Sequence, residues 1–158
     1  MIELSIAVIL SSIPILYAAT GELVVERSGV LNLGVEGMML MGAVIASITV
    51  IETGNPYLAI FSGALAGVLT SFIFGFFTLV LATNQVATGL ALTIFGTGLS
   101  GLIGADYVGK AILRLNPINF PILHELPVFG SILFSHNILV YTAFIMVFIV
   151  SWFLLKTK

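Results

Sequence analysis

The sequence predicts an all-α fold, a polytopic transmembrane bundle of about five helices with a short extracytoplasmic interfacial helix. Of the 158 residues, 59% are hydrophobic and 8% are charged, whereas soluble domains carry about 25% charged residues. The mean hydropathy is +1.23. Several apolar runs approach the roughly 20 residues that a helix needs to cross the hydrocarbon core, and none alternates as the strands of a membrane β-barrel do.

The expected helices occupy the apolar runs at residues 3–20, 31–51, 57–82, 86–105 and 138–155. The first run lacks the basic start of a secretory signal peptide, and Pro14 and Tyr17 interrupt it, so we expect a retained transmembrane helix. The third run exceeds the length of a perpendicular span, which indicates a tilted helix. The fifth is rich in Phe, Val and Ile, which is typical of a peripheral, lipid-facing helix. We expect one membrane-spanning domain over residues 1–158.

A polar motif at residues 26–42 lies at the start of the second run. Ser28, Asn32 and Glu36 are spaced four apart, so a continuous helix would align them on one face. If the helix begins later, Asn32 can serve as its N-cap. Glu36 is the one ionisable residue well inside a predicted span, where a charge costs roughly 2.5–3.5 kcal/mol at the bilayer centre. It either faces a pathway inside the bundle or bonds loop backbone near the membrane interface.

A second polar spot, Asn84 and Gln85, separates the third and fourth runs. It lies on the same side of the membrane as Arg27 if every run spans. A simple polar turn explains these two residues as well as a functional role does.

Small residues recur at four-residue steps in the central runs, which predicts close helix packing in lipid. In the third run they are Ala59, Gly63, Gly67, Ser71 and Gly75. In the fourth run they are Gly89, Thr93, Thr97, Gly101 and Ala105, with Gly96, Ser100 and Gly104 alongside. A weaker set in the second run consists of Gly34, Gly42 and Ala46.

The segment 106–137 is too polar to span the membrane. Asp106, Lys110 and Arg114 would share one helical face, which predicts the interfacial helix. Prolines further along the segment exclude a long helix.

His124, Glu125 and His136 lack the spacing of metal ligands, and ordinary surface polarity explains them better. We expect no metal and no cofactor.

The membrane orientation follows from basic residues. Arg27 follows the first run, and Lys156 and Lys158 follow the fifth, which favours a cytoplasmic location for these ends. The N-terminus, the 52–56 connection and the long segment would then face outward. Lys110 and Arg114 oppose this assignment.

Several function classes are excluded. The chain contains no cysteine, so thiol catalysis and cysteine metal sites are impossible. A net charge of −2 gives no support to nucleic-acid binding. No phosphate-binding loop and no catalytic constellation is present, so the chain is not expected to be an enzyme, and another chain must hydrolyse any nucleotide that drives it.

Residues 26–42 and 84–92 together resemble the inner-membrane permeases of bacterial ABC importers. Within these the chain is most similar to the simple-sugar and nucleoside branch, which is related to ribose and branched-chain amino-acid permeases. The stretches 126–130 and 152–155 fit the same branch. The similarity extends over essentially the whole chain.

The resemblance implies a multi-pass protein of the bacterial plasma (inner) membrane that imports nucleosides or simple sugars. It implies three partners besides membrane lipid: an ABC ATPase subunit, an extracytoplasmic substrate-binding protein (often a lipoprotein) and a second permease subunit. It also implies that Asn32, Glu36, Asn84 and Gln85 line or brace the substrate pathway.

Only the N-terminal half of the family's pattern is matched, and the segment that docks on the ATPase would follow Lys158. We therefore expect a half-permease, through truncation or a separate second polypeptide, truncation being the plainer explanation. An ion- or proton-conducting subunit and a scaffold subunit of a larger complex are the alternatives. Dependence of uptake on ATP and on a binding protein separates the permease from both.

Overall fold

The computed structural model describes residues 2–113, 115–117 and 136–157 of the chain. Within these ranges the regular secondary structure is helical, and five helices are long and apolar enough to cross a membrane. The predicted all-α polytopic class is thus confirmed. The chain forms two compact units, residues 1–24 with 115–158 and residues 25–114, and each is described by itself.

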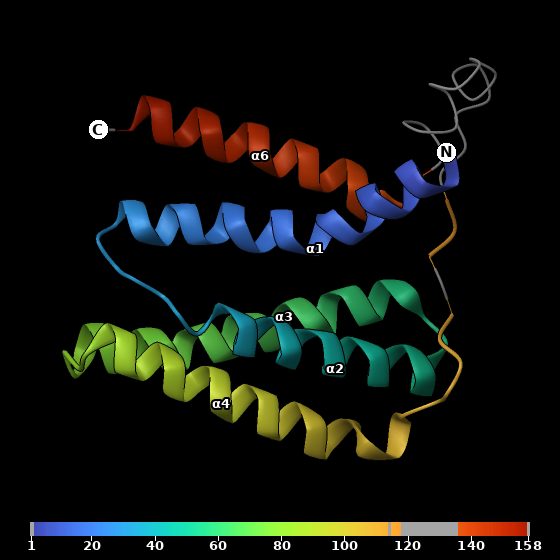
Figure 1. The fold of residues 1–158 in the computed structure, drawn as a ribbon, viewed down its shortest axis with the longest axis horizontal. Coiled ribbons are helices and arrows are strands. Elements are labelled where there is room, and N and C mark those ends of the chain that lie inside the picture. The colour runs from blue at the N-terminus through green and yellow to red at the C-terminus, as the bar shows by residue number, and fades with distance from the viewer. Residues whose placement is uncertain (1, 114, 118–135, 158) are drawn as a thin grey trace. The chain divides into compact units, whose positions relative to one another are not determined.

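The first unit pairs helix α1 (Ile2–Arg27) with helix α6 (Ile138–Lys156), as Figure 1 shows. Ile13, Val140 and Ala143 form its buried core. Ala143 has no exposed surface, so one of the few small residues of the last helix lies at the contact. Close approach at a small side chain is the usual way in which helices pack in lipid.

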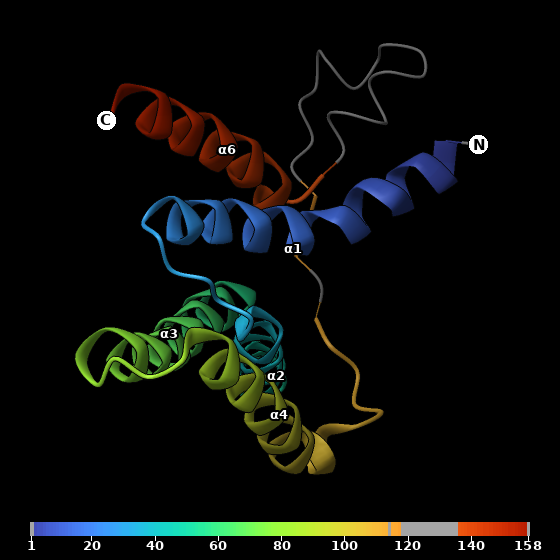
Figure 2. The same cartoon turned by 60° about the vertical axis from the view of Figure 1, so that its left-hand side comes forward.

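A tyrosine links the two helices of this unit. The Tyr17 hydroxyl donates to the Leu139 carbonyl oxygen at 2.9 Å and lies 2.6 Å from the Thr142 hydroxyl oxygen. The phenol is thereby satisfied where the surroundings are apolar. Pro14 lies inside α1, and because it removes one helical hydrogen bond it accounts for the bend of this helix in Figure 2.

Helix α1 continues well past the predicted end at residue 20. Its 26 residues extend about 39 Å at 1.5 Å per residue, more than the ~30 Å of the hydrocarbon core. Glu22, Glu26 and Arg27 lie in the added part. The apolar run marks only the part of the helix that suits lipid. The helix itself continues until a residue adopts a backbone conformation that ends it.

That stop is a Schellman motif at Gly29, whose φ is +81°. The Val30 N–H donates to the Val25 carbonyl oxygen at 3.3 Å, and the Gly29 N–H donates to the Glu26 carbonyl oxygen at 2.9 Å. This pair of bonds satisfies carbonyls that the helix end leaves free, and the left-handed backbone favours glycine.

The predicted polar line is therefore wrong. Ser28 lies in the turn and Asn32 in non-helical backbone, while Glu36 lies in the next helix, so the three residues do not share a helical face. Asn32 is not the N-cap either, because the helix begins at Val35 and Gly34 takes the cap position.

The second unit holds three long helices and two short continuations. They are α2 (Val35–Thr53), α3 (Pro56–Gly75), the π-helix η1 (Phe76–Val80), α4 (Gln85–Gly104) and the 3-10 helix η2 (Ala105–Tyr107). Helix α2 packs against both α3 and α4, which contact each other little (Figures 1 and 2). Met38, Phe74 and Leu92 form the buried core of this unit. Helix α2 is therefore its central element.

Asparagine caps explain why α3, α4 and α6 begin within a residue of the predicted positions. The Asn55 side chain accepts from the Tyr57 and Leu58 N–H groups, with Pro56 at the first position of α3. Asn84 caps α4 and Asn137 caps α6 in the same way. An N-cap satisfies donors that a helix start leaves unpaired.

The expected interfacial helix over Asp106 to Arg114 is not formed in the described residues. Helix η2 ends at Tyr107, and residues 108–113 are not helical. Gly109 adopts φ +81°, which interrupts the right-handed helix. The Lys110 ammonium nitrogen instead lies 4.2 Å from the centre of the Tyr107 ring, in a cation–π contact. Arg114 lies outside the described residues.

The small residues proposed for packing fall into two groups. A methyl group added at Gly34, Gly42, Gly63 or Gly89 would come within 3.3 Å of another helix or of the turn before α2. At Gly67 and Gly101 it would meet nothing within 4 Å, at Gly75 it would meet only Leu79 of the following turn, and Ser71 is exposed.

Candidate functional site

The turn before α2 is held against the start of α4 by two side chains. The Leu31 N–H donates to Gln85 Oε1 at 2.8 Å, and the Gly34 N–H donates to Asn32 Oδ1 at 2.9 Å. Asn32 is 7% exposed. The structure thus brings together two of the predicted polar residues, separated by about fifty positions in the sequence, and gives each a backbone partner.

Helix α4 approaches the same turn at backbone level. The Thr93 hydroxyl donates to the Leu33 carbonyl oxygen at 2.8 Å. A methyl group at Gly89 would lie 2.8 Å from the Leu33 nitrogen and 3.0 Å from the Gly34 nitrogen. A side chain at Gly89 would therefore push the turn away from α4.

One turn further along, Gly37 of α2 meets α4 directly. A methyl group at Gly37 would lie 2.6 Å from the Leu92 carbonyl oxygen, and one at Gly96 would lie 2.6 Å from the Gly37 carbonyl oxygen. Sequence reasoning did not select Gly37, and it placed Gly96 beside the four-residue stripe rather than on it. The sequence shows a glycine in each of two separate helices, and no pattern within either helix indicates that the two glycines face each other.

The four predicted pathway residues differ in their surroundings. Asn84 is exposed and accepts from the Ala87 N–H at 3.0 Å as the N-cap of α4. Glu36 is exposed in the first turn of α2, where the helix dipole favours a negative charge. Its carboxylate has no hydrogen bond or ion pair with the described part of the chain. Asn32, Asn84 and Gln85 thus hold backbone groups, whereas the Glu36 carboxylate is available.

A groove with polar groups lies between α2 and α4 at the opposite end from this turn, with a volume of about 390 Å³. Ser47 on α2, Ser100 on α4, Tyr107 and Lys110 contribute its polar atoms, among apolar side chains. Sequence reasoning missed Ser47 and Tyr107 and selected Ser100 only as a small packing residue, because isolated hydroxyls in apolar helices carry no pattern.

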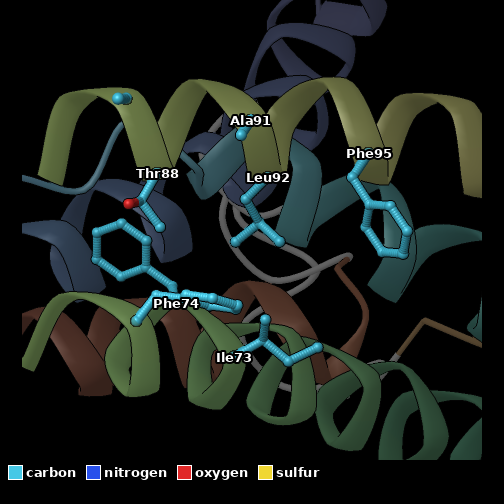
Figure 3. A pocket seen from close by; sticks show the side chains of 8 residues that line it. Ile73, Phe74, Thr88, Ala91, Leu92 and Phe95 are labelled. Atoms are coloured by element: carbon cyan, nitrogen blue, oxygen red, sulfur yellow. The ribbon is translucent and has the colours of Figure 1, made fainter. Parts of the chain in front are cut away.

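A second hollow, of about 510 Å³, lies between α3 and α4. Figure 3 shows Ile73 and Phe74 on one side and Leu92 and Phe95 on the other, with Thr88 as the one lining residue that carries a hydroxyl. Its lining suits a hydrocarbon surface rather than a polar solute.

The predicted site residues lie in the second unit, apart from the candidate metal ligands. Of those, His124 and Glu125 lie outside the described residues, and His136 is 2% exposed beside the start of α6.

The five helices of the described residues that are long and apolar enough to cross a membrane define the class, a multi-pass membrane protein. Residues 4–158 match the family described as the branched-chain amino acid transport system / permease component. The chain belongs to this family.

Three curated relatives were compared with the chain. It is 38% identical over 148 residues to the provisionally named glucose ABC transporter permease protein TsgC13 of Haloferax volcanii, covering 91% of this chain and 45% of the relative. It is 28% identical to the nucleoside ABC transporter permease protein NupC of Lactococcus lactis, covering 93% and 50%. It is 30% identical to the guanosine ABC transporter permease protein NupQ of Bacillus subtilis, covering 94% and 50%.

The chain therefore spans about half the length of these relatives. No solved structure matches it.

Proposed function

We propose that residues 1–158 form part of the membrane-spanning permease of an ATP-driven importer for a nucleoside or a simple sugar. The family and the names of the three relatives support this class. The structural observation that carries it is the junction of α2 and α4. There the turn before α2, which Asn32 and Gln85 brace, lies against the start of α4 beside a close glycine contact, and polar residues between membrane helices are usually found along transport pathways.

In this proposal the polar residues have two roles. Asn32 and Gln85 brace the turn before α2 through their bonds to the Gly34 and Leu31 N–H groups, and Asn84 braces the start of α4. Glu36 faces the substrate pathway, because its carboxylate is exposed and bonds no described residue.

The partners are those that an ABC transporter permease implies. An ABC ATPase on the cytoplasmic side supplies the energy. An extracytoplasmic substrate-binding lipoprotein delivers the solute, and a second permease subunit completes the pathway. The proposal requires no metal and no cofactor.

Uptake by the complete transporter tests this proposal. The complete permease would be expressed with its ATPase and its substrate-binding protein, and membrane vesicles would be given radiolabelled guanosine or glucose. We expect uptake of one of these that requires both ATP and the binding protein. Ion flux without ATP would favour a conducting subunit, and an assembled complex that moves neither solute would favour a scaffold.

A further inference from the structure

The groove between α2 and α4 exists because the two helices stop touching at backbone level after Gly37 and Gly96. At Gly101 an added methyl group would meet nothing within 4 Å, and at Gly104 it would meet only the Val44 side chain, at 3.0 Å. Gly101 and Gly104 both line the groove. The absence of side chains there leaves the space open.

A short strap, defined as residues 108–113, covers one end of the groove. It follows η2, and the left-handed backbone of Gly109 turns it. Val108, Lys110 and Ile112 of the strap line the groove. Beyond them, the Leu113 side chain lies 3.8 Å from the position that a methyl group at Gly54 would occupy, so the strap reaches from the end of α4 to the end of α2.

The hydroxyl of Ser47 is available to a ligand. Most other hydroxyls in these two helices bond back to the preceding turn, as Thr49 does to the Ile45 carbonyl oxygen and Ser100 to the Thr97 carbonyl oxygen, while Thr93 bonds the Leu33 carbonyl oxygen. Ser47 Oγ makes no hydrogen bond to any residue that the structure describes. The Ser47 side chain is half-buried, so its hydroxyl can reach a polar ligand in the groove.

The remaining lining defines the class of that ligand. Ser47 and Ser100 present hydroxyls from two helices, and the Lys110 ammonium group provides a donor at the end. Lys110 covers one face of the Tyr107 ring, which leaves the other face of the ring for an apolar contact. Ligand pockets usually measure about 300–1,000 Å³, and this groove measures about 390 Å³. No carboxylate lines the groove itself, and the Glu52 carboxylate beside it bonds the Tyr107 side chain.

We infer that this groove is a binding subsite for an uncharged polyhydroxylated solute, a sugar or the ribosyl part of a nucleoside. The inference rests on the proposed transport function and adds the place where the solute is held. Hydroxyls from both helices exchange hydrogen bonds with the solute, and the Tyr107 ring packs against its apolar face. The α3/α4 hollow, lined by apolar side chains and one hydroxyl, lacks this chemistry.

Two kinds of variant test the subsite in the full-length transporter with its ATPase and binding protein. Ser47→Ala and Ser100→Ala each remove one hydroxyl and should raise the KM for the transported probe about three- to tenfold, as the loss of one hydrogen bond does. Ser71→Ala is the matched control, because Ser71 is exposed on α3 outside the groove and bonds its own helix. The probes are radiolabelled guanosine and glucose.

Filling the groove is the second test. Gly101→Leu places a side chain in the open space and should abolish uptake while the complex still assembles. Gly98→Leu is its control, because Gly98 lies on the same helix, meets nothing within 4 Å and does not line the groove. Copurification of the ATPase reports assembly of every variant. If Gly101→Leu fails to assemble, the two serine variants still decide, since they leave the backbone contacts unchanged.

The outcomes separate this inference from the proposed function. If the wild-type transporter takes up neither probe in an ATP-dependent manner, the proposed function fails and the subsite with it. If the wild type transports a probe, and Ser47→Ala and Ser100→Ala have the same KM as the control Ser71→Ala, the proposed function stands and the subsite is overturned. A raised KM in both serine variants supports the subsite.

Discussion

Gly37 of α2 and Gly96 of α4 face each other with no room for a side chain between them. A methyl group at Gly96 would lie 2.6 Å from the Gly37 carbonyl oxygen and 2.7 Å from its Cα atom. This contact holds two parallel helices at backbone distance, next to the turn that Gln85 and Asn32 brace. Packing and polar bonding therefore stabilise the same end of the α2–α4 pair.

Gly96→Ala should destabilise the protein by about 1–3 kcal/mol, the usual cost of an extra methyl group in a packed interface. Gly98→Ala adds the same group to the same helix, in open space, and should change little. Thermal unfolding of the full-length protein in detergent measures both. Equal losses in the two variants would contradict the Gly37–Gly96 contact.

Gly63→Ala should be destabilising and Gly67→Ala nearly neutral, although both lie on the same four-residue stripe. A methyl group at Gly63 would lie 2.9 Å from the Ala46 Cβ atom and 2.9 Å from the Gly42 carbonyl oxygen, whereas one at Gly67 would meet nothing within 4 Å. Detergent stability compares the two variants directly. A larger effect at Gly67 would show that another surface covers that part of α3.

Gln85→Ala should lower stability by about 0.5–1.5 kcal/mol, because it removes the acceptor of the Leu31 N–H group. Gln85→Glu keeps an acceptor oxygen at the same reach and, at the start of α4, a charge that the helix dipole favours. Its stability should remain close to that of the wild type. Equal losses for both variants in the same thermal assay would show that the bond contributes nothing.

Glu36→Gln in the complete transporter should impair uptake more than assembly. The carboxylate is exposed and bonds no described residue, so removing its charge costs the fold little while it changes the electrostatics of the pathway. Uptake at several solute concentrations and copurification with the ATPase measure the two effects. Normal uptake at every concentration would remove Glu36 from the pathway.

Glu52 should face outward and Glu26 the cytoplasm, since Arg27 and Lys156 place the ends of α1 and α6 inside. Both glutamates are exposed and neither caps a helix, although the Glu52 side chain bonds Tyr107. With any cysteine beyond residues 1–158 replaced, Glu52→Cys should react with an impermeant thiol reagent in intact cells. Glu26→Cys should react only after permeabilisation. The reverse pattern would overturn the orientation.

The sequence by itself determined the number and approximate position of the membrane helices. Hydrocarbon thickness sets how long an apolar run must be, and asparagine caps such as Asn55 and Asn84 mark helix starts through bonds to residues two or three positions away. Both effects are local, so they can be read from the chain alone. The predicted end of α1 and the predicted interfacial helix were wrong, because the backbone conformations of Gly29 and Gly109, rather than hydropathy, set where the helices stop.

Only the tertiary structure decided which small and polar residues meet. The four-residue spacing that unites Gly63 and Gly67 defines a face of α3, but a helix face does not state which neighbour covers it or for how many turns. Gly37 and Gly96 carried no stripe of their own, yet a methyl group added at either would lie 2.6 Å from the backbone of the facing helix. Likewise, Ser47 and Ser100 became candidate ligand groups only because α2 and α4 diverge between them. The distance between two helices depends on every side chain along their contact, which no local pattern contains.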